Sequence, residues 1–344
     1  MPYLQHQVIS SPFIQLNYDR WQSVVNIQMR EEAEVADEEY LYAYRKRCII
    51  EPAFGWALTE EIELIAESFP FAHFVLDQFK PRLTASQYQK KEKCVLPEAV
   101  LLWENYTNYF HFLNDFVGRL ALLDRLNISR QIPVVVPFQV RISNLFKQFR
   151  ELCPDFFDRN WCFQQGYLEV SEVTYFVKST SCIYSNFQPL LNELSHLSAH
   201  DDTPERIFIT RSAKHGRGVV NALEIEKIAV ENGFAIVDTA NLTVAEQIRL
   251  FNKATHVIGL HGAGLTNMVF CQKKGVRMLE IFPGNFFKAV YYWLAAACAH
   301  QYDCLLGEPT QDETLEIGTG ATVFKSNFYL SPKAFSVKLA EWIN

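Results

Sequence analysis

The chain has 344 residues, more than twice the roughly 150 residues of a typical domain, so two packed domains are predicted. Hydrophobic residues make up 49% and charged residues 21%, a composition that excludes disorder as the main state. The 32 basic and 39 acidic residues give a net charge of −7, which argues against broad electrostatic binding to nucleic acid.

Targeting signals are not found in the sequence. The N-terminus has no basic start followed by an apolar run, so neither a secretion signal nor a membrane anchor is predicted. The longest apolar stretches, near 257–270 and 291–299, are shorter than the about 20 residues that a bilayer-spanning helix needs. The 8 cysteines show no C-x-x-C pair and no metal-ligand spacing. These features predict a cytoplasmic protein, and they are compatible with peripheral contact to the inner face of the membrane.

Residues 1–93 form the least regular part of the chain. The segment TEEIELIAESF, residues 59–69, has the pattern of a helix. From Cys94 onward strands and helices alternate. The predicted elements are strands at 100–103 and 133–136, helices at 108–126 and 140–152, an extended stretch at 167–177 and a helix at 189–197.

The second half repeats this alternation more clearly. Strands are predicted at 206–210, 235–237, 256–260 and 277–282, with helices at 221–232 and 244–253 and a C-terminal amphipathic helix. Short apolar strands separated by amphipathic helices predict a parallel sheet covered on both faces. Asn232-Gly233 suits a helix stop, and Thr243 with Glu246 matches a capping box. The predicted domains are 1–186 and 187–330, followed by the helix at 331–344.

A glycine-rich turn follows the predicted strand 256–260 and precedes a helix-like stretch. This arrangement directs backbone N–H groups at a phosphate, and a tight turn without a ligand is the structural alternative. Its partial G-x-G-x-x-G pattern has Asn267 at the third glycine position, and Glu280 at the end of the next strand suits a ribose hydroxyl in a dinucleotide or a sugar nucleotide. The turn comprises His261, Gly262, Ala263, Gly264, Leu265, Thr266 and Asn267.

A basic segment follows the predicted strand 206–210. Arg211, Lys214 and Arg217 place three cations within seven residues at a strand end, which predicts a clamp for a diphosphate. A solvated basic loop is the structural alternative. Asn221 and Glu224 begin the next helix and are further candidates for binding the diphosphate ligand, and Glu224 could instead form an ion pair with Arg217.

A possible acid–base pair lies on the helix at 108–126. His111 and Asp115 are four residues apart and therefore share one helix face, as a base and its partner would. A purely structural hydrogen bond is the alternative. The sequence contains no D-x-D after a strand, no G-x-S-x-G, no H-E-x-x-H and no P-loop.

Four segments in this order resemble glycosyltransferase family 61. They are NYFHFLND (108–115), ITRSAKHGRGVVNALE (209–224), LHGAGLTNMVF (260–270) and LEIFP (279–283). The adjacent Asn-Glu of the family pattern is replaced here by Asn221-Ala222, with an acid two residues further on at Glu224. The resemblance implies an α/β protein of the GT-B type, in which two Rossmann-like domains with mainly parallel sheets face each other and the C-terminal one holds the nucleotide.

The resemblance also implies inverting transfer of a sugar from a nucleotide-linked donor, UDP being the expected nucleotide, to a glycan or lipid-linked acceptor in polysaccharide biosynthesis. Neither a cofactor nor a metal ion is expected. Asp115 is expected to act as the base or to orient His111 as the base, the cationic segment and the glycine turn are expected to stabilise the diphosphate, and Glu280 is expected to hold the ribose. A non-catalytic nucleotide-sugar-binding protein and a nicotinamide-dependent oxidoreductase are the alternatives. The sequence leaves the oligomeric state open.

Overall fold

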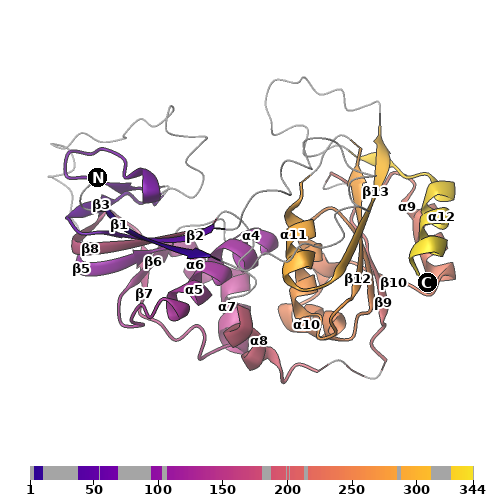
Figure 1. Ribbon diagram of the computed structural model, residues 1–344, viewed down its shortest axis with the longest axis horizontal. Helices are drawn as coiled ribbons and strands as arrows, with labels where there is room; N and C mark the ends of the chain where they lie inside the picture. The colour runs from indigo at the N-terminus through magenta and orange to yellow at the C-terminus, as the bar shows by residue number, and fades with distance from the viewer. Residues whose placement is uncertain are drawn as a thin grey trace. The chain divides into compact units, whose positions relative to one another are not determined.

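The protein has a mixed α/β fold in a computed structural model (Figure 1). The structure describes residues 4–10, 38–53, 55–68, 94–102, 107–179, 187–198, 200, 202–212, 216–284, 288–310 and 327–343. The chain divides into two compact units, and the described residues up to Leu194 belong to the first unit and those from Ser195 to the second.

The first unit is built on a mixed sheet of strand order β1-β2-β8-β5-β6-β7, with β3 and β4 beside β8. Strand β5 is parallel to β8 and to β6, and β6 is parallel to β7. Strands β2 and β3 pair antiparallel with β8, so the expectation of a mainly parallel sheet is wrong for this unit. The strands are β1 (Leu4–Ser10), β2 (Glu38–Tyr44), β3 (Cys48–Ile50), β4 (Ala57–Leu58), β5 (Cys94–Leu101), β6 (Val134–Pro137), β7 (Trp161–Gln164) and β8 (Leu168–Ser179).

The helix expected at 59–69 is also wrong. After β4 the chain turns through Ile62, whose φ of 67° is incompatible with a right-handed helix. Ile65 then donates its backbone N–H to the carbonyl of Ala57. Only a short 3₁₀ turn, η1 (Ala66–Ser68), forms. Pairing of this segment with β4 therefore overrides the local helical pattern.

Helices and aromatic side chains complete the first unit. The predicted helix at 108–126 is confirmed as α4 (Tyr109–His111), the π-helical segment η3 (Phe112–Val117) and α5 (Gly118–Arg125). The one expected at 140–152 is divided by Ser143 into α6 (Phe138–Ile142) and α7 (Asn144–Leu152). Phe116 of η3 stacks on Trp161, and Phe146 meets the same indole edge-on. Such aromatic pairs bury large apolar areas, and this cluster anchors the helices to β7.

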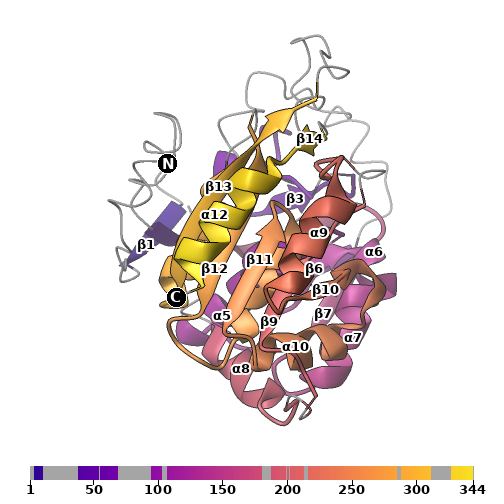
Figure 2. The same ribbon diagram turned by 90° about the vertical axis from the view of Figure 1, so that its right-hand side faces the viewer.

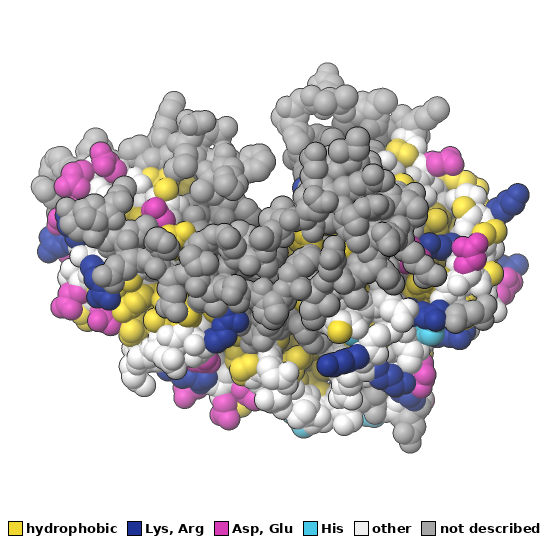
Figure 3. Space-filling model, viewed as in Figure 1, with side chains coloured by type: hydrophobic (Ala, Val, Ile, Leu, Met, Phe, Trp, Pro, Cys, Tyr) yellow, Lys and Arg dark blue, Asp and Glu magenta, His cyan; other side chains and the backbone are white. Residues whose placement is uncertain are grey.

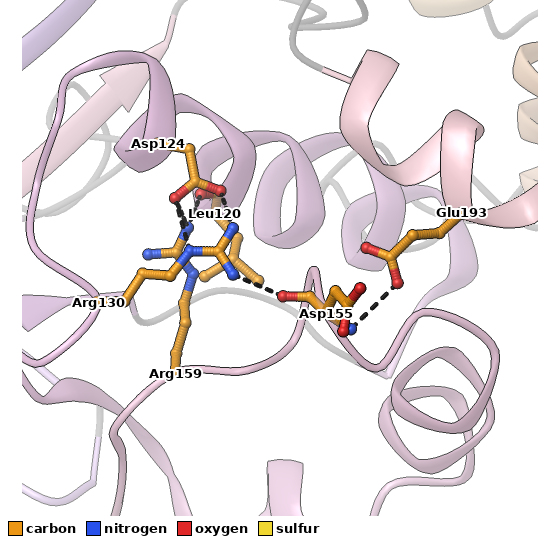
Figure 4. Close-up of polar contacts among 6 residues, drawn as sticks. All are labelled: Leu120, Asp124, Arg130, Asp155, Arg159 and Glu193. Atoms are coloured by element: carbon orange, nitrogen blue, oxygen red, sulfur yellow. Dashed lines mark hydrogen bonds and ion pairs between the residues drawn. The ribbon is translucent and has the colours of Figure 1, made fainter.

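An ion cluster around the buried Arg159 fastens the end of α5 (Figure 4). Asp124 accepts from Arg130 at 2.8 Å and from Arg159 at 2.7 Å, and the side chain of Arg159 is 1% exposed. Arg130 also donates to the carbonyl of Asp155, whose N–H is bound by Glu193 of helix α8 (Gln188–Leu194). The cluster ties α8 to the first unit, whereas the domain boundary predicted after residue 186 precedes this helix.

The second unit is built on a sheet of strand order β10-β9-β11-β12-β13-β14. All its pairs are parallel except β13 with β14, which confirms the parallel sheet predicted for this half. The strands are β9 (Arg206–Ile209), β10 (Ala235–Val237), β11 (His256–Leu260), β12 (Arg277–Pro283), β13 (Gln301–Pro309) and β14 (Phe328–Tyr329).

Helices cover both faces of this sheet. Helices α9 (Ala222–Glu231) and α12 (Pro332–Trp342) lie side by side on one face (Figures 1 and 2), and α10 (Val244–Asn252) and α11 (Val290–Ala297) lie on the other (Figure 1). Phe208, Ile258 and Ile281 of the strands are fully buried in one core with Phe335 and Leu339 of α12. The C-terminal helix predicted as a separate element is thus part of the second unit.

The local signals at helix ends are confirmed. Thr243 and Glu246 form the reciprocal capping box at the start of α10. Helix α9 ends at Asn232, and Gly233 follows with a φ of 81°, a conformation that costs glycine little.

One face of the described surface carries charged side chains of both signs among hydrophobic ones (Figure 3). On the face shown in Figure 3, basic and acidic side chains are interspersed on the described part of each unit. Within the described ranges, no helix combines the length and the apolar character that crossing a membrane requires.

Candidate functional site

The predicted basic segment and glycine turn meet at the point where the strand order of the second sheet reverses. The chain runs from β9 to β10 on one side, and then returns to β11 on the other side of β9. In open α/β sheets, ligands bind in the crevice beyond the carboxyl ends of the two strands at such a switch point. The arginine loop, residues 210–218, follows β9, and the glycine turn, residues 261–264, follows β11.

The glycine turn allows the arginine loop to approach its backbone closely. A Cβ atom on Gly262 would lie 2.7 Å from Nη1 of Arg211, so the guanidinium rests directly against this glycine. A Cβ atom on Gly264 would lie 2.8 Å from Oγ1 of Thr239. The turn leads into the 3₁₀ helix η7 (Ala263–Phe270), whose first turn is closed by Leu265 N–H donating to the carbonyl of Gly262.

Two guanidinium groups are concentrated at this point. Arg211 donates through Nε to the carbonyl of Gly216 at 2.8 Å. Burial lowers the pKa of Arg211, and the neighbouring cation of Arg217 lowers it further. Burial also lowers the pKa of Arg217, against the opposing influence of Tyr291 and Glu280. Two partly buried like charges repel each other, and an anion between them would relieve that repulsion.

Arg217 in the arginine loop has an unusual backbone conformation. Arg217 has a φ of 57°, in the left-handed region that non-glycine residues seldom occupy. Such strain is concentrated at functional sites. Lys214, the third predicted cation, lies outside the described residues.

His261 and Glu280 form a buried pair beside the arginines. Nδ1 of His261 lies 2.5 Å from Oε1 of Glu280, and the two residues are 5% and 1% exposed. The hydroxyl of Tyr302 donates to Oε2 of Glu280 at 2.5 Å. Burial raises the pKa of Tyr302 well above 10, so the phenol keeps its proton. Both carboxylate oxygens of Glu280 are therefore engaged within the protein, although the sequence suggested a ribose as their partner.

The remaining residues of the predicted turn support its shape. Asn267 donates to Oε1 of Gln247 on α10 at 2.7 Å and to the carbonyl of Gly264 at 3.1 Å. Leu265 and Thr266 are buried, and Leu265 lies directly against Gly259. Ala263 is partly buried. These residues therefore form the base of the turn.

Asn221 and Glu224 have structural partners. The amide of Asn221 donates to the carbonyl of Leu330 at 2.9 Å and accepts from its N–H at 3.1 Å. It thereby ties the start of α9 to the chain preceding α12. Glu224 is exposed and accepts a hydrogen bond from Asn221 at 3.3 Å.

Sequence reasoning missed Tyr302 and Glu226. Tyr302 of β13 lies opposite Met278 of β12 in their parallel register. Met278 is two residues from Glu280, so the two side chains are on the same face of the sheet. Glu226 of α9 accepts a hydrogen bond from Thr210, the first residue of the arginine loop. No local motif signals either contact, because each depends on how separate elements pack.

The predicted pair in the first unit is formed. Nδ1 of His111 lies 2.5 Å from Oδ2 of Asp115, and their side chains are 34% and 14% exposed. Asn114 donates to the other carboxylate oxygen at 2.8 Å, and Asn108 caps the helix by accepting from the N–H groups of Phe110 and His111. Asp115 lies within the π-helical segment η3, and π-helical turns are frequent at functional sites.

In the described part of the chain, no three His, Cys, Asp or Glu side chains converge on a point where they could hold a metal ion. The titratable groups that converge at the end of the second sheet include, among the described residues, Arg211, Arg217, His261 and Glu280.

The second unit is an open α/β sheet whose switch point carries groups suited to an anion. Residues 109–278, about half of the chain, match the family model described as Glycosyltransferase 61, and the chain belongs to glycosyltransferase family 61. The resemblance inferred from the motifs is thus confirmed, and the family indicates glycosyltransferase activity. No curated protein matches the sequence. The matched stretch contains the His111–Asp115 pair, the arginine loop and the glycine turn, and it ends before Glu280.

Proposed function

We propose that the protein is an inverting, metal-independent glycosyltransferase of the GT-B type, which moves a sugar from a UDP-linked donor to a hydroxyl of a glycan or lipid-linked acceptor. In this proposal it acts in the cytoplasm or at the inner face of the membrane, in surface or capsular polysaccharide synthesis. The observation that carries the proposal is the contact of the Arg211 guanidinium with Gly262, beside Arg217, at the switch point of the second sheet.

The second unit supplies the donor site in this proposal. When the bond to the sugar breaks, negative charge develops on the departing diphosphate. Arg211, Arg217 and the N–H groups after Gly262 would stabilise that charge, each charged hydrogen bond contributing about 1.5–3 kcal/mol. These cations take the role that a divalent metal has in other transferases. A transfer rate that persists in excess chelator is the expected result.

The first unit supplies the base. Inversion is a single displacement, so one group must take the proton of the acceptor hydroxyl. Asp115 either does this itself or holds Nδ1 of His111, so that Nε2 of His111 takes the proton. The observed 2.5 Å contact supports both assignments.

Donor binding is tested first by thermal shift with UDP, GDP, CMP and TDP sugars and with NADH, each with and without divalent cation. A ligand at 100 times its Kd stabilises the native state by about 2.7 kcal/mol, which raises Tm by several degrees. A metal-independent shift with one nucleotide sugar supports the proposal and names the donor. A shift with NADH alone would instead indicate an oxidoreductase.

Two variants then separate donor binding from catalysis. Arg217→Ala is expected to abolish transfer and to weaken donor binding about 10-fold or more. Asp115→Asn is expected to lower transfer about 100-fold or more with donor binding retained. Lys227→Ala and Asp158→Asn, at exposed positions, are the matched controls. The wild type could instead bind the donor but transfer no sugar, with donor binding unchanged by Asp115→Asn. That result would indicate a non-catalytic nucleotide-sugar-binding protein.

A further inference from the structure

Glu280 is a carboxylate at the edge of a site that otherwise gathers positive charge. It is 1% exposed, and Arg217 lies within electrostatic range of it. A carboxylate that faced a bound diphosphate would repel it. The structure shows instead that its two oxygens are taken by His261 and Tyr302, at 2.5 Å each.

These contacts define how the imidazole of His261 is held. A carboxylate accepts hydrogen bonds at both oxygens, so Nδ1 of His261 is the donor toward Glu280. The ring is also flanked by Phe282, stacked at a centroid distance of 5.1 Å, and by Tyr291, edge-on at 5.3 Å. Its orientation is therefore set on three sides. With Nδ1 directed at Glu280, Nε2 is the nitrogen through which His261 acts on a ligand.

The position of His261 directs that action toward a diphosphate. It is the first residue of the glycine turn, and the next residue, Gly262, contacts the Arg211 guanidinium. Its backbone N–H donates to the carbonyl of Ile281 at 2.9 Å, which ties the turn to the strand that carries Glu280.

We propose that Glu280 is a positioning residue, which together with Tyr302 holds the ring of His261 protonated on both nitrogens, so that Nδ1–H donates to Glu280 and Nε2–H donates a hydrogen bond to the diphosphate of the donor. The inference rests on the proposed function. It concerns two residues beyond the matched stretch 109–278. In metal sites, a carboxylate that orients a ligating histidine changes metal affinity by about 10- to 100-fold without touching the metal ion. Glu280 has the same relationship to His261.

A double-mutant cycle tests this inference, with inorganic pyrophosphate as the probe because it is the group shared by nucleoside diphosphates. His261→Asn keeps an amide donor near the position of Nδ1 and removes Nε2. Glu280→Gln keeps the size of the side chain and removes its charge. Each single variant is expected to bind pyrophosphate about 10-fold more weakly, and the double variant no more weakly than His261→Asn alone.

The cycle distinguishes positioning from general structural damage. If Glu280→Gln lowers affinity by the same factor in the wild-type and in the His261→Asn background, or has no effect in either, the inference is wrong. Glu308→Gln, the same substitution at an exposed position of β13, is the control and is expected to leave binding unchanged.

Spectroscopy provides a second test that does not depend on the stability of Glu280→Gln. The ¹⁵N resonances of His261, assigned by their loss in His261→Asn, are expected to show a protonated Nδ1 in the wild type and protons on both ring nitrogens when pyrophosphate is bound. Tyr302→Phe, which removes one hydroxyl, is expected to shift the Nδ1 resonance and to weaken pyrophosphate binding several-fold. A wild-type ring protonated only at Nε2 would overturn the inference.

The failure of the inference and the failure of the proposed function give different results. If the wild type binds neither pyrophosphate nor any nucleoside diphosphate, both are wrong. If the wild type binds them and Glu280→Gln and Tyr302→Phe bind equally well, the donor site stands and only the positioning role of Glu280 is wrong.

Discussion

Glu226 of helix α9 accepts a hydrogen bond from the hydroxyl of Thr210 at 2.5 Å. Thr210 immediately precedes Arg211, and its N–H donates to the carbonyl of Val237 at the end of β10. The strand end from which the arginine loop departs is therefore held by both a neighbouring strand and a helix. Because of this anchoring, we expect Thr210 and Glu226 to affect the binding of the nucleotide-sugar donor through the position of Arg211.

Thr210→Val tests that expectation. The substitution keeps the shape of the side chain and removes its hydroxyl, so Glu226 loses a hydrogen bond worth about 1 kcal/mol. Donor affinity, measured by calorimetry, is expected to fall about 5-fold because Arg211 is less well positioned. Thr210→Ser keeps the hydroxyl and is expected to bind like the wild type. Equal affinity in the valine and serine variants would contradict the anchoring role.

Gly262→Ala is expected to impair donor binding more than folding. The new Cβ would lie 2.7 Å from Nη1 of Arg211, the end of a flexible side chain that moves at little cost. The backbone of Gly262 is extended, with a φ of 170°, so alanine adds no strain there. Donor affinity should fall about 10-fold, whereas the free energy of unfolding should change by less than about 1 kcal/mol.

Gly284→Ala provides the contrast. Its Cβ would lie 2.4 Å from the carbonyl oxygen of Gly307, a backbone atom that can move only with its strand. Denaturant unfolding is expected to show a loss of about 1–3 kcal/mol. If Gly262→Ala lost as much stability as Gly284→Ala, the Arg211 side chain against Gly262 would not be free to move aside, and this prediction would be wrong.

Asp124→Asn is expected to destabilise the first unit without affecting donor binding. The buried Arg159 guanidinium would lose its anionic partner (Figure 4). Leaving such a charge uncompensated costs about 3–5 kcal/mol, and the lower end applies because Asp124 is partly exposed. Urea unfolding measures the loss, and pyrophosphate titration of the folded variant is the control. A change below about 1 kcal/mol would show that the cluster is not needed for stability.

The buried His300 predicts a pH dependence of stability. It is 1% exposed, and burial lowers its pKa below the ordinary 6.5, although Nε2 contacts the carbonyl of Met268. The unfolded chain therefore binds a proton at His300 more readily than the native chain does. The stabilisation that neutral His300 adds to the native state is complete above about pH 6.5. It is lost as the pH falls from 6.5 toward the lower native pKa.

His300→Gln tests this sign, because the amide can still donate to Met268 without titrating. The decrease in unfolding free energy between pH 7 and pH 5.5 is expected to be smaller in this variant than in the wild type. Part of the decrease should remain, since burial also lowers the pKa of His256. If the unfolding free energy of His300→Gln decreased as much as that of the wild type, or more, His300 would not be a source of the pH dependence.

Local features of the candidate site could be predicted because their partners are close in sequence. His111 and Asp115 meet because residues four apart share a helix face, and the capping box of Thr243 and Glu246 is similarly local. Apolar strands alternating with helices predicted the parallel sheet of the second unit. The same logic failed in residues 59–69, where pairing between Ile65 and Ala57 replaced a helical pattern.

By itself, the sequence determined the family, most of the alternating strands and helices between Cys94 and Pro283, and the motifs that follow β9 and β11. It did not indicate β7, α11, β13 or β14. Only the tertiary structure decided which groups these motifs meet. Gly262 contacts Arg211 because the strand order places β9 beside β11, and Tyr302 reaches Glu280 because β12 and β13 pair in one particular register. The physical reason is that strand pairing and helix packing join segments that are far apart in the sequence. Many segments could form the same hydrogen bonds or cover the same apolar faces, and only the packed core selects among them.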